Sequence, residues 1–239
     1  MIDWHSHVLS GMDDGSKSVA ESVQLLKELR AQGVDTVIAT PHYYADDESV
    51  ESFLQRREES YQSLCAQVED LSKISGNGDL PKIVLGTEVC YYPAIRRLER
   101  LLDLRIGQSD LLLLEMPSRK WSEYTLREIE EISEIRGVTL ILAHIERSFP
   151  FQSPKTLERL YESRILMQSN AGFFTALGTR SKALRLLRDG KVHLIGSDCH
   201  NTTSRPPRME KAFHVISKKF GEHFITQMNE FGQTLLVKE

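Results

Sequence analysis

Residue types that bind metal ions follow several short apolar segments of this chain. His5-Ser6-His7 follows the segment 1–4, and Asp198-Cys199-His200 follows the segment 192–196 after one serine. Alternate residues of an extended strand point to the same side, so each triplet can present two ligands to one cation. Further candidates stand at the ends of four other apolar segments: His42, Glu88, Glu115 and His144.

The chemistry of these candidates favours a centre with more than one metal ion. Imidazole nitrogens mixed with carboxylate oxygens suit manganese, iron or zinc better than calcium or a metal that prefers thiolates. A lone His-x-His pair is more often an incidental surface feature, but coincidence does not account for the whole set. The candidates also outnumber the positions in one coordination sphere.

The apolar segments have the length and composition of β-strands, and segments of helical period lie between them. Seven strands are predicted, at 1–4, 37–40, 82–85, 111–114, 138–143, 165–168 and 192–196. Helices are predicted at 19–32, 49–73, 93–102, 123–136, 154–163, 179–189 and 208–219, with a last one at 221–236. This alternation predicts parallel strands joined by right-handed crossovers.

An α/β fold of this kind is either an open doubly wound sheet or a closed barrel. An open sheet concentrates its site at one switch point, whereas a barrel brings all its strand ends to one rim. Because polar clusters follow all seven predicted strands, we expect the barrel.

Composition limits the class of protein further. A chain of 239 residues with 40% hydrophobic residues fits a single domain spanning 1–239. Its apolar stretches are too short to cross a bilayer, and no secretory signal is expected. Cys65, Cys90 and Cys199 are scattered, which suits a reducing compartment and predicts a cytoplasmic protein. The net charge of -4 lacks the basic excess of nucleic-acid binders, so no such partner is expected.

Taken together, the motifs resemble those of a known family along nearly the whole chain. The chain resembles the polymerase and histidinol phosphatase (PHP) family, most closely its bacterial protein-tyrosine phosphatase branch associated with capsule and exopolysaccharide operons. Besides the two triplets, the matching motifs are Asp13-Asp14-Gly15, Thr40-Pro41-His42, Gly86-Thr87-Glu88, Ala143-His144-Ile145-Glu146-Arg147 and Arg205-Pro206-Pro207.

The resemblance implies a distorted seven-stranded (β/α)7 barrel with up to three metal ions on one rim. One ion would take His5, His7, Glu88 and Asp198. A second would share Glu88 and add Glu115 and His144. The third would take His42, His200 and either Asp13 or Asp14, and the sequence does not decide between these two. Manganese is the expected metal, with iron or zinc as alternatives.

Clustered metal ions on a rim fit the hydrolysis of a phosphate monoester. A water that bridges two ions is acidified to a pKa of about 7 and can attack phosphorus. The cations also neutralise the phosphate oxygens. Arg147 and Arg205 follow the ligands His144 and His200 and resemble the phosphate-binding arginines of the family. Asp198 or a metal-bound water is expected to protonate the leaving phenolate.

A cysteine nucleophile is the competing interpretation. Cys199 and Arg205 have the C-x5-R spacing of cysteine-dependent tyrosine phosphatases. That loop normally cradles phosphate with backbone N–H groups and glycines ahead of a helix. Here residues 200–204 contain no glycine and two prolines follow, so we expect the metal-dependent mechanism. Cys65 and Cys90 are expected to be packing residues.

The resemblance implies a phosphotyrosine substrate, on the tail of a bacterial tyrosine autokinase that controls capsule or exopolysaccharide synthesis. Aromatic residues near the strand ends suggest walls for an aryl ring, although such residues also fill cores: Tyr43, Tyr44, Tyr91, Tyr92, Trp121, Tyr124, Phe149, Phe151, Phe173 and Phe174. Two alternatives stay open. One is a small-molecule phosphatase such as a histidinol-phosphate phosphatase, and the other is a catalytically silent metal-binding interaction module.

Overall fold

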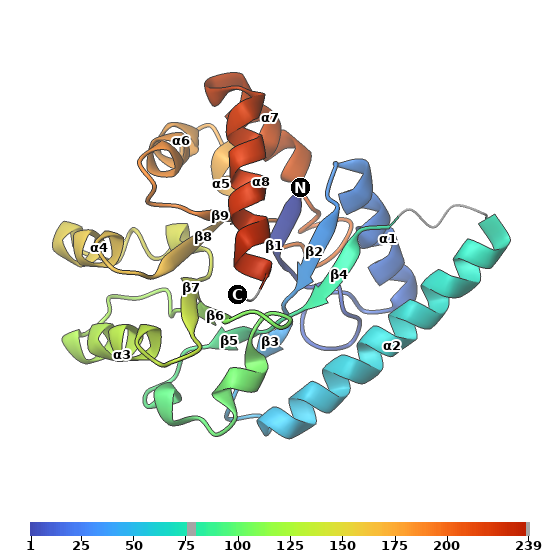
Figure 1. Ribbon diagram of the computed structural model, residues 1–239, viewed down its shortest axis with the longest axis horizontal. Coiled ribbons are helices and arrows are strands. Elements are labelled where there is room, and N and C mark those ends of the chain that lie inside the picture. The colour runs from blue at the N-terminus through green and yellow to red at the C-terminus, as the bar shows by residue number, and fades with distance from the viewer. Residues whose placement is uncertain (76–79, 238–239) are drawn as a thin grey trace.

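Parallel strands form the centre of the fold, and helices surround them (Figure 1). The computed structural model describes residues 1–75 and 80–237. One sheet has the strand order β1 (Ile2–Ser6), β2 (Thr36–Ala39), β4 (Lys82–Leu85). The other has the order β3 (His42–Tyr43), β5 (Glu88–Cys90), β6 (Leu111–Glu115), β7 (Thr139–Leu142), β8 (Leu166–Asn170), β9 (Leu194–Gly196). All seven predicted strands are therefore present.

Two of the predicted strands are followed by a short second strand that the sequence did not reveal. β3 follows β2 after Thr40 and Pro41, and β5 follows β4 after Gly86 and Thr87. Pro41 has no backbone N–H to give to a ladder. A Cβ at Gly86 would lie 3.2 Å from the Thr40 side chain, so the two breaks pack closely together. The breaks carry His42 and Glu88 into the second sheet, where they pair in register.

The strands curl so that the first and the last meet at their carboxyl ends. Just past β9, the backbone N–H of Asp198 donates to the carbonyl of His5 at 2.7 Å. The N–H of His7 in turn donates to the carbonyl of Cys199 at 2.9 Å. The prediction of an α/β fold built on parallel strands is confirmed.

Most of the predicted helices are also present. In α1 (Val19–Ala31), the Ser18 side chain accepts a hydrogen bond from the N–H of Glu21, as the capping pattern predicts. The long α2 (Val50–Ser75) runs along one side of the molecule (Figure 1). The others are α3 (Glu123–Ser133), α4 (Pro154–Tyr161), α5 (Ala171–Thr175), α6 (Arg180–Arg188), α7 (Met209–Phe220) and α8 (Glu222–Leu236), of which only α5 was not predicted.

The predicted helix at 93–102 is wrong. Two 3-10 turns, η1 (Ile95–Arg97) and η2 (Leu101–Leu104), occupy this segment instead. Ala94 and Arg100, which precede the two turns, have φ angles of 69° and 63°. A left-handed residue cannot continue an α-helix, so the apolar spacing here serves two separate turns.

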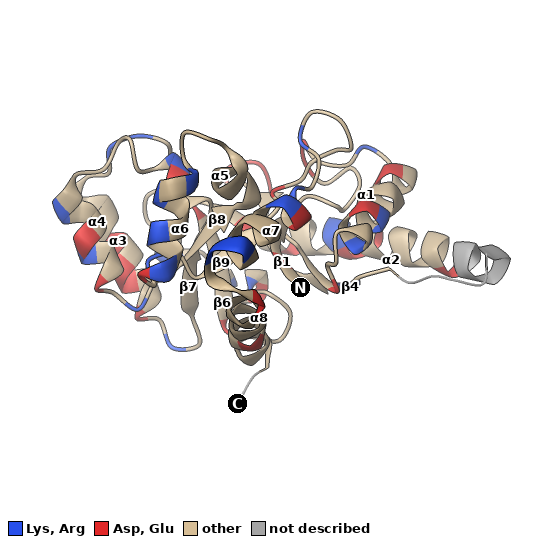
Figure 2. Cartoon of the chain, turned by 90° about the horizontal axis from the view of Figure 1, so that it is seen from above, with Lys and Arg blue, Asp and Glu red and all other residues tan. Residues whose placement is uncertain are grey.

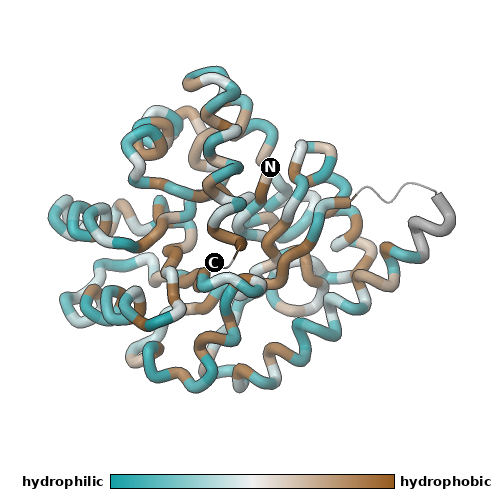
Figure 3. Tube along the Cα trace, in the orientation of Figure 1, coloured by the Kyte–Doolittle hydropathy of each residue, from teal (hydrophilic) through white to brown (hydrophobic). Residues whose placement is uncertain are grey.

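Both faces of the curled sheet are buried. In β6, Leu112 and Leu114 pack in the layer between the strands and the helices, whereas Leu111 and Leu113 belong to a second cluster with Trp4. Figure 3 shows the hydrophobic strands at the centre and hydrophilic segments along the outer helices. This two-sided burial explains why the strands read as continuous apolar runs instead of alternating ones.

Helix α8 closes the side of the second cluster. A Cβ at Gly232 would lie 2.9 Å from the ring of Trp4, so glycine allows the helix to approach β1 closely. The outer helices carry residues of both charge signs (Figure 2). Among the described helices, none combines the length and the apolar character that crossing a membrane requires.

Candidate metal centre

The candidate ligands gather at the carboxyl ends of the strands. β1 carries His5, β3 carries His42, β5 carries Glu88 and β6 carries Glu115. The remaining ones lie just past strand ends: His7 after β1, His144 after β7, and Asp198 and His200 after β9. All of these side chains are buried except His42 and Glu115, which are partly buried. The convergence follows from the parallel arrangement, which places every strand end on one rim.

A first group consists of His5, His7 and Asp198, with Glu88 beside them. Nε2 of His5 lies 3.2 Å from Nε2 of His7 and 3.0 Å from Oε2 of Glu88. Nε2 of His7 lies 3.4 Å from Oδ1 of Asp198. The ligand atoms therefore point toward one another.

A second group shares Glu88 with the first. Oε1 of Glu88 lies 2.8 Å from Nε2 of His144, and Oε1 of Glu115 lies 3.2 Å from the same nitrogen. Because the two oxygens of Glu88 face different histidines, this carboxylate is the link between the two groups.

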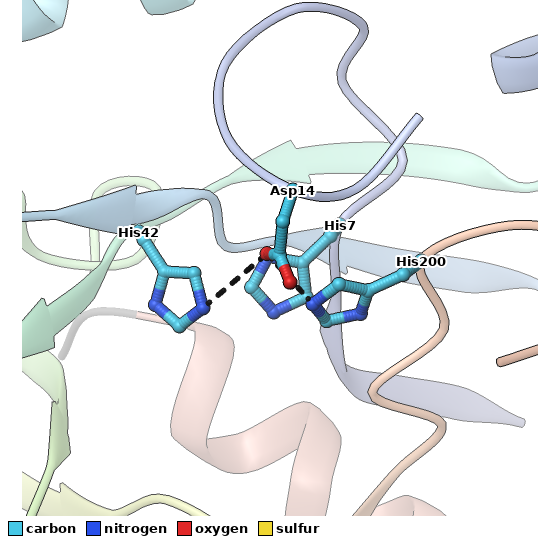
Figure 4. A group of neighbouring side chains, drawn as sticks. All are labelled: His7, Asp14, His42 and His200. Carbon is cyan, nitrogen blue, oxygen red and sulfur yellow. Dashed lines mark ion pairs between the residues drawn. The ribbon is translucent and has the colours of Figure 1, made fainter. Parts of the chain in front are cut away.

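A third group contains His7, Asp14, His42 and His200 (Figure 4). Oδ1 of Asp14 lies 3.1 Å from Nε2 of His200 and 3.8 Å from Nε2 of His42. The side chain of Asp14 points down from its loop between the two imidazoles, as Figure 4 shows.

Asp13 has a different position from Asp14. One of its oxygens accepts hydrogen bonds from Nδ1 of His7 at 2.7 Å and from the backbone N–H of His42 at 2.8 Å. The other accepts from the N–H of Gly15 at 2.8 Å. Asp13 therefore holds His7 and the backbone of His42 in position, and Asp14 is the one of the two that directs an oxygen toward the imidazoles of the third group.

Two buried polar atoms of the centre lie close to oppositely charged candidate ligands without forming a hydrogen bond, which suits bound cations. Oε2 of Glu88 and Nε2 of His200 are buried, and neither makes a hydrogen bond with the described residues. Buried polar groups are normally satisfied, and an exception calls for an explanation such as an ion. Opposed imidazole nitrogens 3.2 Å apart, surrounded by carboxylates, also suit divalent metal ions.

Gln168 of β8 holds two candidate ligands in place. Its side-chain oxygen accepts a hydrogen bond from the backbone N–H of His144 at 2.7 Å and lies 3.2 Å from Nδ1 of His5. Since an oxygen cannot donate, the proton on this edge of the ring belongs to Nδ1 of His5. The opposite nitrogen, Nε2, then keeps its lone pair for a metal.

Two candidate ligands occupy backbone conformations that are uncommon outside glycine. His144 has a φ angle of 29° and Asp198 one of 52°. Such conformations cost on the order of 1–3 kcal/mol and persist where the surroundings fix them. Beside Asp198, the buried carboxylate of Asp3 accepts hydrogen bonds from both the N–H and the hydroxyl of Ser197, each at 2.6 Å.

Arg147 and Arg205 both reach the carboxylate of Asp198. Arg147 pairs with Oδ2 of Asp198, and Nη2 of Arg205 lies 2.9 Å from the same oxygen. Burial alone would raise the pKa of Asp198, but His5, His7 and Arg147 outweigh it and hold this pKa well below its usual range. Asp198 is therefore ionised, and two guanidinium groups lie at the edge of the centre.

Cys199 lacks the properties of a nucleophile. Its side chain is fully buried, and this burial raises the pKa of the thiol far above its usual range, with a further contribution from Asp3. A reactive cysteine needs both access and a lowered pKa. Cys199 therefore has the environment of a packing residue.

Two residues lie beside the centre that were not predicted to do so, and one of them, Cys90, was expected to be a packing residue. Glutamine is not a typical metal ligand, so nothing in the sequence singled out Gln168. Cys90 lies with His42 and Glu115 in a fourth group whose ligand atoms are all within 4.8 Å of one another. Its position two residues after Glu88 repeats the spacing of His5 and His7, and this was the signal available in the sequence.

The aromatic residues expected near the strand ends differ in burial. Tyr91 and Tyr92 are partly buried, and Tyr124 and Phe151 are exposed. Tyr43, Trp121, Phe149, Phe173 and Phe174 are buried and belong to the core. Tyr44 is exposed and lies beside the centre, with its ring centroid 5.4 Å from that of His42. Only part of the expected aromatic rim is therefore available to a substrate.

Known proteins are similar to this chain along most of its length. Tyrosine-protein phosphatase YwqE of Bacillus subtilis is 29% identical over 245 residues, covering 99% of this chain and 91% of the relative. Tyrosine-protein phosphatase CpsB of Streptococcus pneumoniae is 31% identical over 237 residues, covering 92% and 91%.

A solved structure and a family model extend the comparison. The solved structure is one of the crystal structures of YwqE and CpsB, which are described as metal-dependent tyrosine phosphatases. It has a TM-score of 0.79 and 24% identity, and the match covers 99% of this chain and 94% of that one. The model for capsular polysaccharide synthesis proteins, CpsB/CapC, matches residues 1–233. The chain belongs to the CpsB/CapC family, as the resemblance of its motifs predicted.

Proposed function

We propose that this protein is a metal-dependent protein-tyrosine phosphatase. The observation that carries the proposal is the convergence of three linked groups of buried histidines and carboxylates, including buried atoms without hydrogen-bond partners. The names of the relatives support it, since CpsB and YwqE are called tyrosine-protein phosphatases. The reaction is hydrolysis of a phosphate monoester.

The ligand assignment follows the three groups. His5, His7, Glu88 and Asp198 would hold one ion, and Glu88, Glu115 and His144 a second. For the third, His42 and His200 are joined by Asp14, because Asp13 is already occupied with His7 and the backbone. The donor set of nitrogen and oxygen favours manganese, with iron or zinc as alternatives, and up to three ions per chain.

Bound metal ions supply Lewis-acid activation of water and neutralise phosphate charge. The protein contributes the groups that bind and orient the phosphate. Arg147 and Arg205 are 38% exposed in their side chains and meet at Asp198, so their guanidinium groups are placed to donate to phosphate oxygens. Both would neutralise charge that develops on these oxygens during transfer.

Asp198 acts as a ligand and not as a general acid in this proposal. Its low pKa leaves it without a proton to give at neutral pH. A tyrosine leaving group needs little protonation, because a phenol ionises far more readily than an alcohol. This matches the proposed preference for phosphotyrosine over phosphoserine.

Tyr44 is the aromatic residue best placed to contact the substrate ring, because it is exposed beside His42. The physiological substrate we infer is the phosphorylated tail of a bacterial tyrosine autokinase that acts in capsule or exopolysaccharide synthesis. Membership of a capsular polysaccharide synthesis family supports this choice. We further propose that the curled sheet corresponds to a distorted seven-stranded barrel, in one cytoplasmic domain spanning 1–239.

A comparison of two peptides tests the substrate class. A phosphotyrosine peptide is expected to be hydrolysed at least about 10-fold faster than the same peptide with phosphoserine, because leaving group and ring contacts both favour it. The measurement is kcat/KM from phosphate release with manganese-loaded protein. Equal rates on both peptides would contradict a tyrosine phosphatase.

Replacing Cys199 with alanine is expected to leave kcat within about twofold of the wild-type value. The thiol is buried and protonated, so it takes no part in the proposed mechanism. Steady-state kinetics on the phosphotyrosine peptide provide the measurement, with a thermal melt to confirm folding. Complete loss of turnover in a folded variant would support the cysteine mechanism instead.

A further inference from the structure

Cys90 stands on the ligand-bearing side of β5. Glu88 and Cys90 are alternate residues of this strand and therefore point to the same side. Val89, between them, is fully buried and belongs to the core on the other side. In the neighbouring strand, Glu115 pairs in register with Cys90. β5 therefore offers a Glu-x-Cys arrangement to the centre in the same way that β1 offers His5 and His7.

Cys90 contacts two residues that could bind a metal ion. Its thiol donates a hydrogen bond to Oε2 of Glu115 at 3.1 Å, and Sγ lies 3.7 Å from Nδ1 of His42. The side chain is partly buried and makes no disulfide among the described cysteines. Thiol, carboxylate and imidazole are thus within reach of one cation.

The shared carboxylate of Glu88 also faces this place. Its Oε2 is fully buried and lies 3.0 Å from Nε2 of His5 as well as 3.1 Å from Nδ1 of His42. This is the ring nitrogen that also faces Cys90, whereas Nε2 of His42 faces Asp14. The two edges of one imidazole therefore face two different groups of candidate ligands, and a neutral imidazole can bind a cation in only one of them at a time.

We propose that Cys90, with His42 and Glu115, gives this centre a thiolate ligand position that takes a thiophilic divalent cation such as zinc, cadmium or cobalt. The inference rests on the proposed function, because it adds a ligand to the same metal centre. On binding, the thiol proton passes to solvent and sulfur bonds to the cation. Thiolate ligands favour such metals, whereas manganese prefers oxygen and nitrogen. Cys90 thereby determines which metal ions can compete with manganese for binding at this centre.

Titration of chelator-stripped protein with cobalt(II) tests the inference. A sulfur–cobalt bond produces a charge-transfer band in the near ultraviolet, while cobalt on any ligands produces weaker bands in the visible region. Wild-type protein is expected to show both. Cys90→Ser should lose the near-ultraviolet band and keep the visible ones.

The other two cysteines provide matched controls. Cys65→Ser on α2 and Cys199→Ala in the core should both keep the charge-transfer band. Competition with cadmium gives a second measurement, in which Cys90→Ser is expected to bind cadmium at least about 10-fold more weakly with manganese affinity unchanged.

The outcomes separate this inference from the proposed function. Visible bands without a charge-transfer band in the wild-type protein, or a charge-transfer band that survives in Cys90→Ser, would overturn the role of Cys90 and leave the metal centre in place. Absence of every cobalt band would contradict the metal centre itself, and the inference with it.

Discussion

Replacing Glu88 with glutamine is expected to lower kcat on a phosphotyrosine peptide by at least about 10³-fold. Glu88 is fully buried, and its two oxygens lie 2.8 Å from His144 and 3.0 Å from His5. Glutamine has the same shape but no charge, and its amide group would turn N–H donors toward the histidines. The variant therefore loses the carboxylate that links two groups of ligands.

Kinetics and metal analysis together measure this effect. Glu88→Gln should contain less manganese per chain than the wild-type protein after the same loading and dialysis. Glu131→Gln is the matched control, because Glu131 is exposed on α3 and, among the described residues, forms an ion pair only with Arg96. Turnover at the wild-type rate in Glu88→Gln would refute the metal-dependent mechanism.

The second large effect is expected from the two arginines. Arg147→Ala and Arg205→Ala should each lower kcat/KM by about 10²–10³-fold, because each removes a charged donor from the phosphate site. Bound manganese should stay at the wild-type level, since neither side chain is assigned as a ligand. Lysine at either position should recover only part of the activity, because it lacks the planar fork of arginine.

A control variant separates this effect from a general loss of positive charge. Arg188 lies at the end of α6, where it pairs with Asp189. Because this residue precedes β9, it lies near the amino ends of the strands, away from the candidate ligands. Arg188→Ala should keep full activity. Loss of manganese in Arg147→Ala or Arg205→Ala would contradict the separation between ligands and phosphate-binding residues.

The candidate ligands could be predicted from the sequence because parallel strands convert sequence position into spatial position. His5, Glu88 and His144 are far apart in the chain, but each follows an apolar segment, and all strand ends meet on one rim. The strands themselves were recognisable since both their faces are buried, as the two clusters around β6 illustrate.

Details that depend on local backbone geometry could not be predicted. Asp13 and Asp14 are neighbours of the same type, and only their hydrogen bonds distinguish the support for His7 from the candidate ligand. The helix expected at 93–102 was wrong because two left-handed residues divide it. Periodicity carries no information on such φ angles.

Partners of the ligands were also beyond sequence reasoning. Gln168 is separated from His5 by most of the chain, and its role depends on which atom its amide oxygen faces. The aromatic residues near the strand ends share one sequence context, yet Phe174 is buried and Tyr44 is exposed. Packing between elements decides these cases, and a single sequence does not record it.

The most direct test of the account is the hydrolysis of a phosphotyrosine peptide by the same protein before and after removal of its metal. After chelator treatment and dialysis, kcat should be at least about 10³-fold lower than before, and added manganese should restore it. Glu88→Gln should not recover under the same manganese concentration. Stripped protein that keeps the full rate, with no metal detected in it, would contradict a metal-dependent phosphatase.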